Sequence, residues 1–182
     1  MTLAGWQLAL VELVGGQPGQ PPDDAALSPA ERSWLADVCA APGFEVTAQV
    51  RRWWRRFRVA SCAPLTLEVL GPSRDDVLDG YLDAFPQPTS FYVREATRFL
   101  GYATTTGSGP HLASVAAFES AMLRAAQGQP AAEPLVAFRA PPQAVLAALI
   151  SGSAPPEPHP TRRWWLLVSP ELPQLCREVS SG

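Results

Sequence analysis

Histidine is the residue most often used for proton transfer and metal ligation near neutral pH, and this chain contains two, His111 and His159. Neither has a metal-ligating partner three or four residues further on, so the sequence offers no histidine-based metal motif. The chain also lacks the nucleophile-elbow, phosphate-loop, dinucleotide and zinc-protease motifs. We therefore predict no catalytic residues, no metal ligands and no cofactor in this chain.

Acidic and thiol groups occur in patterns with more ordinary explanations. Asp75, Asp79 and Asp83 recur every four residues and would share one helix face. A straight helix rarely surrounds a cation that needs six or more oxygens, so a solvated face is favoured over a divalent-ion site. The three cysteines are odd in number and form no CxxC pair, which predicts reduced thiols, mostly as small core residues.

Glu119 is the one charge within an apolar helical stripe formed by Leu112, Val115, Ala116, Met122 and Leu123. A buried carboxylate is costly unless it is paired, so we expect a structural ion pair with Arg94, Arg98 or an arginine of segment 51–58. A role as general acid or base is a weaker alternative, because no second titrating group stands at fixed spacing from it. A stand-alone enzyme using Glu119 and Cys62 ranks last, since neither has an identified activating neighbour.

Segment 51–58, RRWWRRFR, combines arginines with aromatic residues. Helical spacing would place Val46, Val50, Trp53, Trp54 and Phe57 on one side and the arginines on the other. The simplest interpretation is a helix with its aromatics in the core and a basic outer face. Alternatively, the helix binds an acidic protein partner or single-stranded nucleic acid. The predicted partner surface consists of Arg51, Arg52, Arg55 and Arg58.

Helices are the elements that must position these groups. Periodicity and capping residues predict helices over about 3–14, 28–41, 44–60, 73–85, 90–103 and 111–127, while segment 64–71 is compatible with either a helix or a strand. Prolines become frequent after Gly128. Segments 134–140 and 164–169 are strand-like, with a helix predicted over 142–150. We therefore predict a mainly α protein: an N-terminal helical bundle (1–128) and a small C-terminal α+β lobe (129–182) containing a short sheet.

Bulk properties limit the functional classes. The chain has 182 residues, 47% of them hydrophobic, and a formal net charge of −3. A slightly acidic protein does not attract phosphate backbones overall, which makes general nucleic-acid binding unlikely. The N-terminus lacks the basic region of a signal peptide, and no apolar run reaches the roughly 20 residues of a membrane span. These features predict a cytoplasmic protein with no membrane partner.

The order of several segments resembles the small accessory subunits that accompany multinuclear non-haem iron oxidases in modified-peptide biosynthesis, such as the partner subunit of the methanobactin oxidase. The resemblance is carried by APLTLEVLG (63–71), YLDAFP (81–86), FYVREATRFLGY (91–102), PHLASVAAFESAML (110–123), FRAPPQAVLAALISG (138–152) and WWLLVSPELPQLCR (164–177). More distantly, the chain is similar to a family described as a putative DNA-binding domain that often lies beside such oxidases.

The resemblance implies a non-catalytic subunit whose partner holds the iron. It further implies that the complex binds the leader of a ribosomally made precursor peptide and converts a core cysteine to an oxazolone with an adjacent thioamide. An extended leader could add a strand to an exposed sheet edge. The predicted edge consists of Trp164, Trp165, Leu166, Leu167 and Val168. The alternative function is a nucleic-acid-binding regulator that uses the Arg/Trp-rich helix at 50–58.

Overall fold

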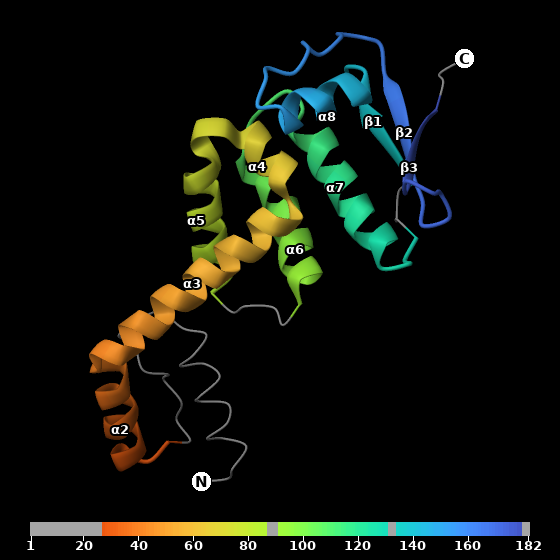
Figure 1. The fold of residues 1–182 in the computed structure, drawn as a ribbon. Helices are drawn as coiled ribbons and strands as arrows, with labels where there is room; N and C mark the ends of the chain where they lie inside the picture. The colour runs from red at the N-terminus through yellow and green to blue at the C-terminus, as the bar shows by residue number, and fades with distance from the viewer. Residues whose placement is uncertain (1–26, 87–90, 131–133, 180–182) are drawn as a thin grey trace. The chain divides into compact units, whose positions relative to one another are not determined.

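The computed structural model describes residues 27–86, 91–130 and 134–179. This part of the chain is mainly helical, with a small antiparallel sheet near the C-terminus (Figure 1). The predicted fold class is therefore confirmed. The helix predicted over residues 3–14 lies outside the described residues.

The first two described helices are α2 (Pro29–Ala40) and α3 (Pro42–Cys62). The predicted capping box of α2 is present: the Ser28 hydroxyl oxygen accepts from the Glu31 amide at 3.4 Å, and the Glu31 carboxylate accepts from the Ser28 amide at 2.7 Å. Two initial backbone donors are thus satisfied by side chains. Leu35 and Cys39 of α2 pack with Leu27 in a small buried cluster.

The remaining helices are α4 (Pro64–Leu70), α5 (Arg74–Ala84), α6 (Tyr92–Thr106), α7 (Leu112–Ala126) and α8 (Pro142–Ile150), with a short 3₁₀ helix, η1 (Gly71–Ser73), before α5. Segment 64–71, compatible with helix or strand by sequence, is thus helical. Gly128 follows α7 with φ +69°, the left-handed conformation typical of a glycine just past a helix end.

The sheet contains β1 (Leu135–Phe138), β2 (Trp164–Val168) and β3 (Cys176–Val179), in the order β1-β2-β3 and antiparallel throughout. The two predicted strands are present and pair with each other. The third, CREV, was not predicted because four residues with two charges carry little strand signal. Its presence makes β2 the central strand, so the prediction that Trp164–Val168 is a free edge is wrong.

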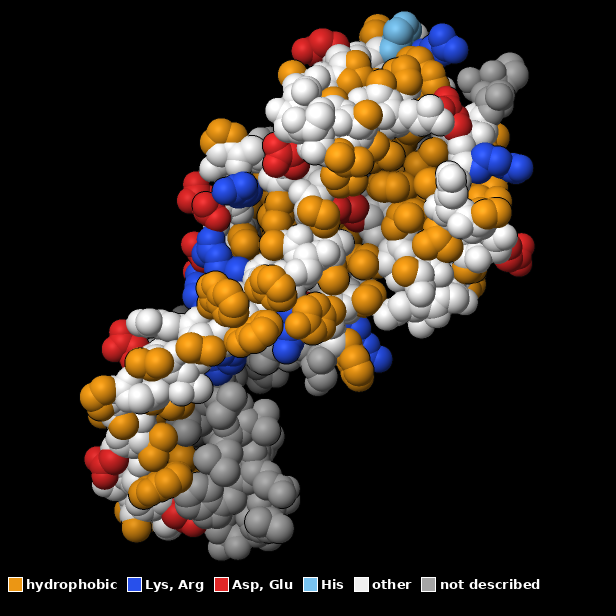
Figure 2. Space-filling model, viewed as in Figure 1, with side chains coloured by type: hydrophobic (Ala, Val, Ile, Leu, Met, Phe, Trp, Pro, Cys, Tyr) orange, Lys and Arg blue, Asp and Glu red, His pale blue; other side chains and the backbone are white. Residues whose placement is uncertain are grey.

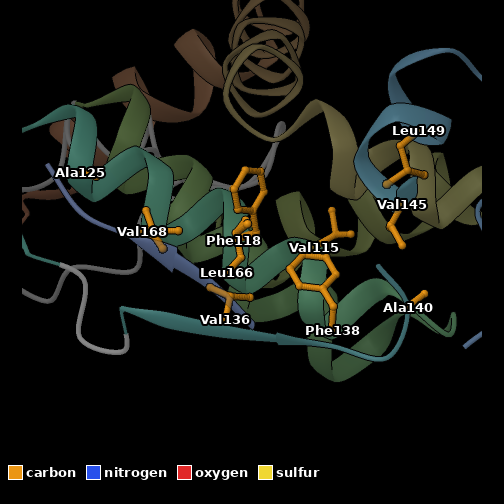
Figure 3. Packing of buried hydrophobic residues seen from close by; sticks show 11 residues of the cluster. Val115, Phe118, Ala125, Val136, Phe138, Ala140, Val145, Leu149, Leu166 and Val168 are labelled. Atoms are coloured by element: carbon orange, nitrogen blue, oxygen red, sulfur yellow. The ribbon is translucent and has the colours of Figure 1, made fainter. Parts of the chain in front are cut away.

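A core cluster joins the sheet to α7 and α8 (Figure 3). Val136 and Phe138 of β1 and Leu166 and Val168 of β2 lie on one face of the sheet and are at most 4% exposed. They point toward Val115 and Phe118 of α7 and toward Val145 and Leu149 of α8. Alternation along each strand produces this face, because successive side chains of a strand point to opposite sides.

The chain divides into two compact units, and the division does not fall after residue 128, where the sequence predicted a boundary. One comprises residues 1–57 and 82–89, and the other 58–81 and 90–182. Helix α7 shares its core with the strands that follow Gly128, which explains why residues 129–182 do not separate as a lobe. In the part of the chain that the structure describes, no helix is both long and apolar enough to span a membrane.

Candidate docking surface

The apolar side of α3 is exposed. Val46 and Trp53 are each 58% exposed, Val50 49%, Phe57 46% and Trp54 43%. Figure 2 shows hydrophobic side chains in a row along this helix, and we call these five residues the α3 aromatic face. The prediction that they fill the core beneath a basic outer surface is therefore wrong.

The aromatic rings of this face pack on one another along the helix. Trp53 and Phe57 are stacked, with centroids 5.8 Å apart, and Trp54 meets them edge-on at 5.2 and 5.6 Å. Phe57 lies one turn after both tryptophans, and residues one turn apart on a helix are neighbours, so local spacing brings its ring against theirs. The result is a preorganised aromatic patch, which would lose little side-chain entropy on binding.

The arginines of the same helix make contacts within the chain. Arg52 pairs with Asp83 at 2.7 Å, and its neighbour one turn on, Arg55, is 4% exposed and donates from Nη1 to the Pro86 carbonyl at 3.3 Å. Arg58 lies over the ring of Tyr92, 5.0 Å from its centroid. Arg55 thus cannot belong to the predicted partner surface, whose residues were expected to face solvent.

Guanidinium chemistry explains why the arginines occupy the inner side. Each presents several donors in a fixed plane and can satisfy carbonyl and carboxylate oxygens while its stem covers apolar surface. The close spacing of the arginines affects their charge: the pKa of Arg51 is lowered, mainly by burial and secondarily by the positive charge of Arg55. Sequence periodicity separates the two faces of α3 but does not reveal which one is covered.

Glu119 of α7 is 5% exposed and forms a different interaction from the predicted ion pair. Its two carboxylate oxygens accept hydrogen bonds from the backbone amides of Leu65 at 2.8 Å and Thr66 at 2.9 Å. These amides belong to the first turn of α4, where no partner exists within the helix. Ala63 precedes α4 and provides no side-chain cap, so Glu119 caps α4 from another helix and joins two helices through a buried polar contact.

Burial raises the pKa of Glu119, and hydrogen bonds from Thr66 and Leu65 oppose that rise. Cys62, at the end of α3, has a raised pKa because of burial and, secondarily, the charge of Glu119. The thiolate is the nucleophilic form of cysteine, so a raised pKa disfavours reactivity. The structure brings Glu119 and Cys62 close enough to interact electrostatically, but in a way that stabilises the unreactive thiol.

The other chemistry-bearing residues have local structural contacts. His111 is 2% exposed and its Nε2 lies 2.9 Å from the Pro156 carbonyl oxygen. His159 accepts from the Arg162 amide at 2.9 Å through Nδ1. Cys39, Cys62 and Cys176 are free thiols. Among residues 27–86, 91–130 and 134–179, no three His, Cys, Asp or Glu residues are grouped so as to hold a metal ion.

The true sheet edges are the outer sides of β1 and β3. The Val168 amide donates to the Pro134 carbonyl, and the Ser169 amide donates to the Leu175 carbonyl. Together with the register, these two bonds show which residues of β1 and β3 turn their backbone groups toward β2 and which turn them away. By that alternation, the amides and carbonyls of Leu135 and Ala137 point away from β2 on one edge. Those of Cys176 and Glu178 point away from it on the other. Each edge therefore offers backbone groups to which an extended peptide could bond.

Comparisons of the chain with protein-family models, with curated proteins and with solved structures find no match.

Proposed function

We propose that this chain is a non-catalytic partner subunit that forms a complex with a multinuclear non-haem iron oxidase and helps bind the leader of a ribosomally made precursor peptide. The reaction would be oxidative conversion of a core cysteine to an oxazolone with an adjacent thioamide, as in methanobactin-type biosynthesis, with the iron held by the oxidase. The oxidase class and the reaction rest on the sequence resemblance. The proposal of a partner-binding role rests on the exposed α3 aromatic face.

The spacing of this face supports a protein partner. Val46, Val50, Trp53 and Phe57 are separated by four, three and four residues, the alternation that forms a straight seam against another helix. Tryptophan is among the residue types that dominate binding energy at protein interfaces. An aromatic side chain buries roughly 150–250 Å² when covered, so three of them would supply much of the apolar core of an interface.

Leader binding would use one of the two edges identified here in place of the central strand. Proline can occupy a strand position whose amide faces away from the neighbouring strand, because no ladder hydrogen bond is lost there. Ala137→Pro and Glu178→Pro should therefore leave the β2 ladders intact while removing one outward donor from β1 or β3. Weakened leader binding by either variant would support edge capture and identify the strand; unchanged binding by both would contradict it.

Coexpression with the candidate oxidase tests the partner role. The tagged chain is purified with that protein, and complex formation and iron content are measured on the same sample. We expect a stable complex that contains iron only when the oxidase is present. The variant pair Trp53→Ser and Phe57→Ser should abolish the complex, whereas Ile150→Ser, at a side chain that is 75% exposed on α8, should not.

Two outcomes would contradict the proposal. In the first, the wild-type chain purifies alone and is indifferent to the oxidase. In the second, the α3 variants remain folded, as judged by circular dichroism, and still bind the oxidase as the wild type does. Ile150→Ser is the matched control because it removes an even more exposed apolar side chain without touching α3.

Nucleic-acid binding by segment 50–58 is the second candidate function, favoured by the exposure of Trp53 and Trp54 beside arginines. Stacking of bases on exposed aromatic rings and phosphate contacts from arginine are the usual features of single-strand binding. The ion pair of Arg52 and the burial of Arg55 weaken this candidate. Binding driven by phosphate contacts should fall steeply with added salt, whereas an apolar protein interface should persist.

A further inference from the structure

The face of the sheet opposite α7 and α8 carries a second pattern that the proposed function does not use. Alternation places Leu135 of β1, Leu167 and Trp165 of β2 and Val179 of β3 on this outer face. Leu135 is 45% exposed, and the other three are partly exposed. The packed helices lie on the other side of the sheet (Figures 1 and 3). The outer face is thus an apolar surface that is partly exposed and that none of these helices covers.

Arginines frame this apolar centre. Arg177 of β3 is paired with Leu167 in the ladder and lies at one end of the outer face. At the other end, Arg139 directly follows β1 and Arg163 directly precedes β2, and continuing the register places them opposite each other. All three are exposed. None of them has an ion pair with another described residue, and alternation places no Asp or Glu of the three strands on this face.

We propose that the outer face of the sheet is a docking site for an acidic amphipathic α-helix of a partner protein. A sheet face that is apolar at its centre is stable when a second layer covers it. Three strands at about 4.8 Å spacing make a face whose width matches a helix about 10 Å across. The apolar stripe of such a helix would cover Trp165 and Leu167, while its carboxylates would meet the arginines.

The positions of the arginines define the charge pattern of the ligand. Four strand residues separate the level of Leu167 and Arg177 from that of Arg163, which corresponds to about 13 Å along the strands. A helix rises about 1.5 Å per residue, so two acidic groups some eight or nine residues apart would reach both ends. Carboxylate contacts to arginine are charge-assisted and can be bidentate, which favours acidic side chains over neutral amides at these points.

The site differs from the α3 aromatic face in position and in charge, and it does not depend on the oxidase assignment. Arg162 is excluded from it, because its guanidinium lies 4.8 Å from the centroid of Trp164, whose side chain belongs to the inner face. A single-stranded nucleic acid would also meet arginine and tryptophan here, but phosphates would not need the apolar centre around Leu135 and Val179. The combination of an apolar centre and cationic ends favours the amphipathic helix.

The test uses the full-length chain and two synthetic helical peptides of about 18 residues, long enough to span the face at 1.5 Å per residue. One carries a leucine stripe with glutamates on both sides, and its counterpart has glutamine at each glutamate. Fluorescence anisotropy measures both affinities for the wild type, for Arg139→Glu/Arg163→Glu and for the charge-matched control Arg74→Glu/Arg94→Glu. Trp53→Ser reports on any binding to α3, and circular dichroism verifies that each variant is folded.

The proposal predicts that the glutamate peptide binds about tenfold more tightly than the glutamine peptide, which is a difference of about 1.4 kcal/mol in binding free energy. Arg139→Glu/Arg163→Glu should remove that preference, while the control pair and Trp53→Ser retain it. Equal affinity of the two peptides, or no effect of the arginine pair, would overturn the proposal. Full displacement of the acidic peptide by an oligothymidine strand would assign the face to nucleic acid, and self-association of the chain that the acidic peptide disrupts would assign it to a second copy.

Discussion

Helices α3 and α7 both carry a regular apolar stripe, yet the two stripes have opposite environments. In α7, Val115 is fully buried and Phe118 is 8% exposed, and both face the sheet. In α3, Trp53 and Phe57 are 58% and 46% exposed. The sequence signal is similar because amphipathicity is a property of one helix. What covers an apolar stripe is a property of its surroundings.

Both helices also bury a charged side chain, but at different places relative to the apolar stripe. Glu119 of α7 is buried within the apolar stripe, where it caps α4 through two backbone amides. On α3 the cation Arg55 is buried on the side away from the aromatic face. Charged side chains can therefore occupy buried positions where they find hydrogen-bond acceptors or donors, while aromatic side chains of the same protein remain exposed.

The largest expected difference between the two regions concerns phenylalanine. Phe138→Ala should lower the free energy of unfolding by about 3–5 kcal/mol, because a fully buried ring leaves a cavity in the core around α7. Phe57→Ala makes the same chemical change at a half-exposed position on α3 and should cost less than about 1 kcal/mol. Urea denaturation of both variants measures the difference, and equal losses would show that α3 has a covered face in solution.

Removal of the carboxylate cap should have the next largest effect. Glu119→Ala leaves the Leu65 and Thr66 amides without their acceptor, at a cost of about 1–3 kcal/mol. Glu68→Ala is the control, since that carboxylate is exposed on α4. Chemical denaturation gives both values, and hydrogen exchange at Leu65 and Thr66 should accelerate only in the first variant. A loss in the free energy of unfolding no larger than that of Glu68→Ala would contradict the capping role of Glu119.

The pH dependence of stability gives a smaller but specific signature of Glu119. Its pKa is raised in the folded protein, chiefly by burial, so the folded state retains this proton to a higher pH than the unfolded state does. Protonation of Glu119 therefore contributes to the free energy of unfolding. This contribution is fully present below the ordinary carboxyl pKa and is lost as the pH rises from there through the pKa of the folded state. The free energy of unfolding of the wild type, relative to that of Glu119→Gln, should decrease across this window. An increase would mean that the amide hydrogen bonds dominate over burial.

The smallest stability effect is expected on the aromatic face itself. Trp53→Ser removes a side chain that is 58% exposed and whose ring packs on Trp54 and Phe57 of the same helix. The free energy of unfolding should change by less than about 1 kcal/mol, while binding to the partner should be lost. Thermal unfolding of the isolated chain measures the first quantity, and a strong destabilisation would assign Trp53 to the core after all.

Local sequence signals predicted most of the secondary structure. The capping box at Ser28 and Glu31, the helix over 142–150 and the strands around Val136 and Leu166 are all present. Each depends on residues near one another in the chain, such as a cap, a first-turn proline or a short apolar run. β3 was not predicted because its pairing with β2 comes from tertiary context rather than from its own composition.

The candidate site was less predictable. Segment 51–58 was correctly identified as an amphipathic helix, but its outward face was predicted to be arginine and is aromatic. Glu119 was correctly predicted to be buried, but its partners are the backbone amides of α4 and not an arginine. No pattern within α3 or α7 indicates these partners, since they come from Asp83, Pro86 and the first turn of α4.

The sequence by itself determined most of the helices, apart from the one at 64–71, and it determined which residues share a face and that a short sheet follows Gly128. Those properties follow from backbone geometry and the periods of helix and strand, which act over a few residues. Only the tertiary structure decided that β2 is central, that Glu119 caps α4 and that the α3 aromatics face solvent. These outcomes depend on which distant groups satisfy a buried donor, acceptor or apolar face, and no local period encodes that choice.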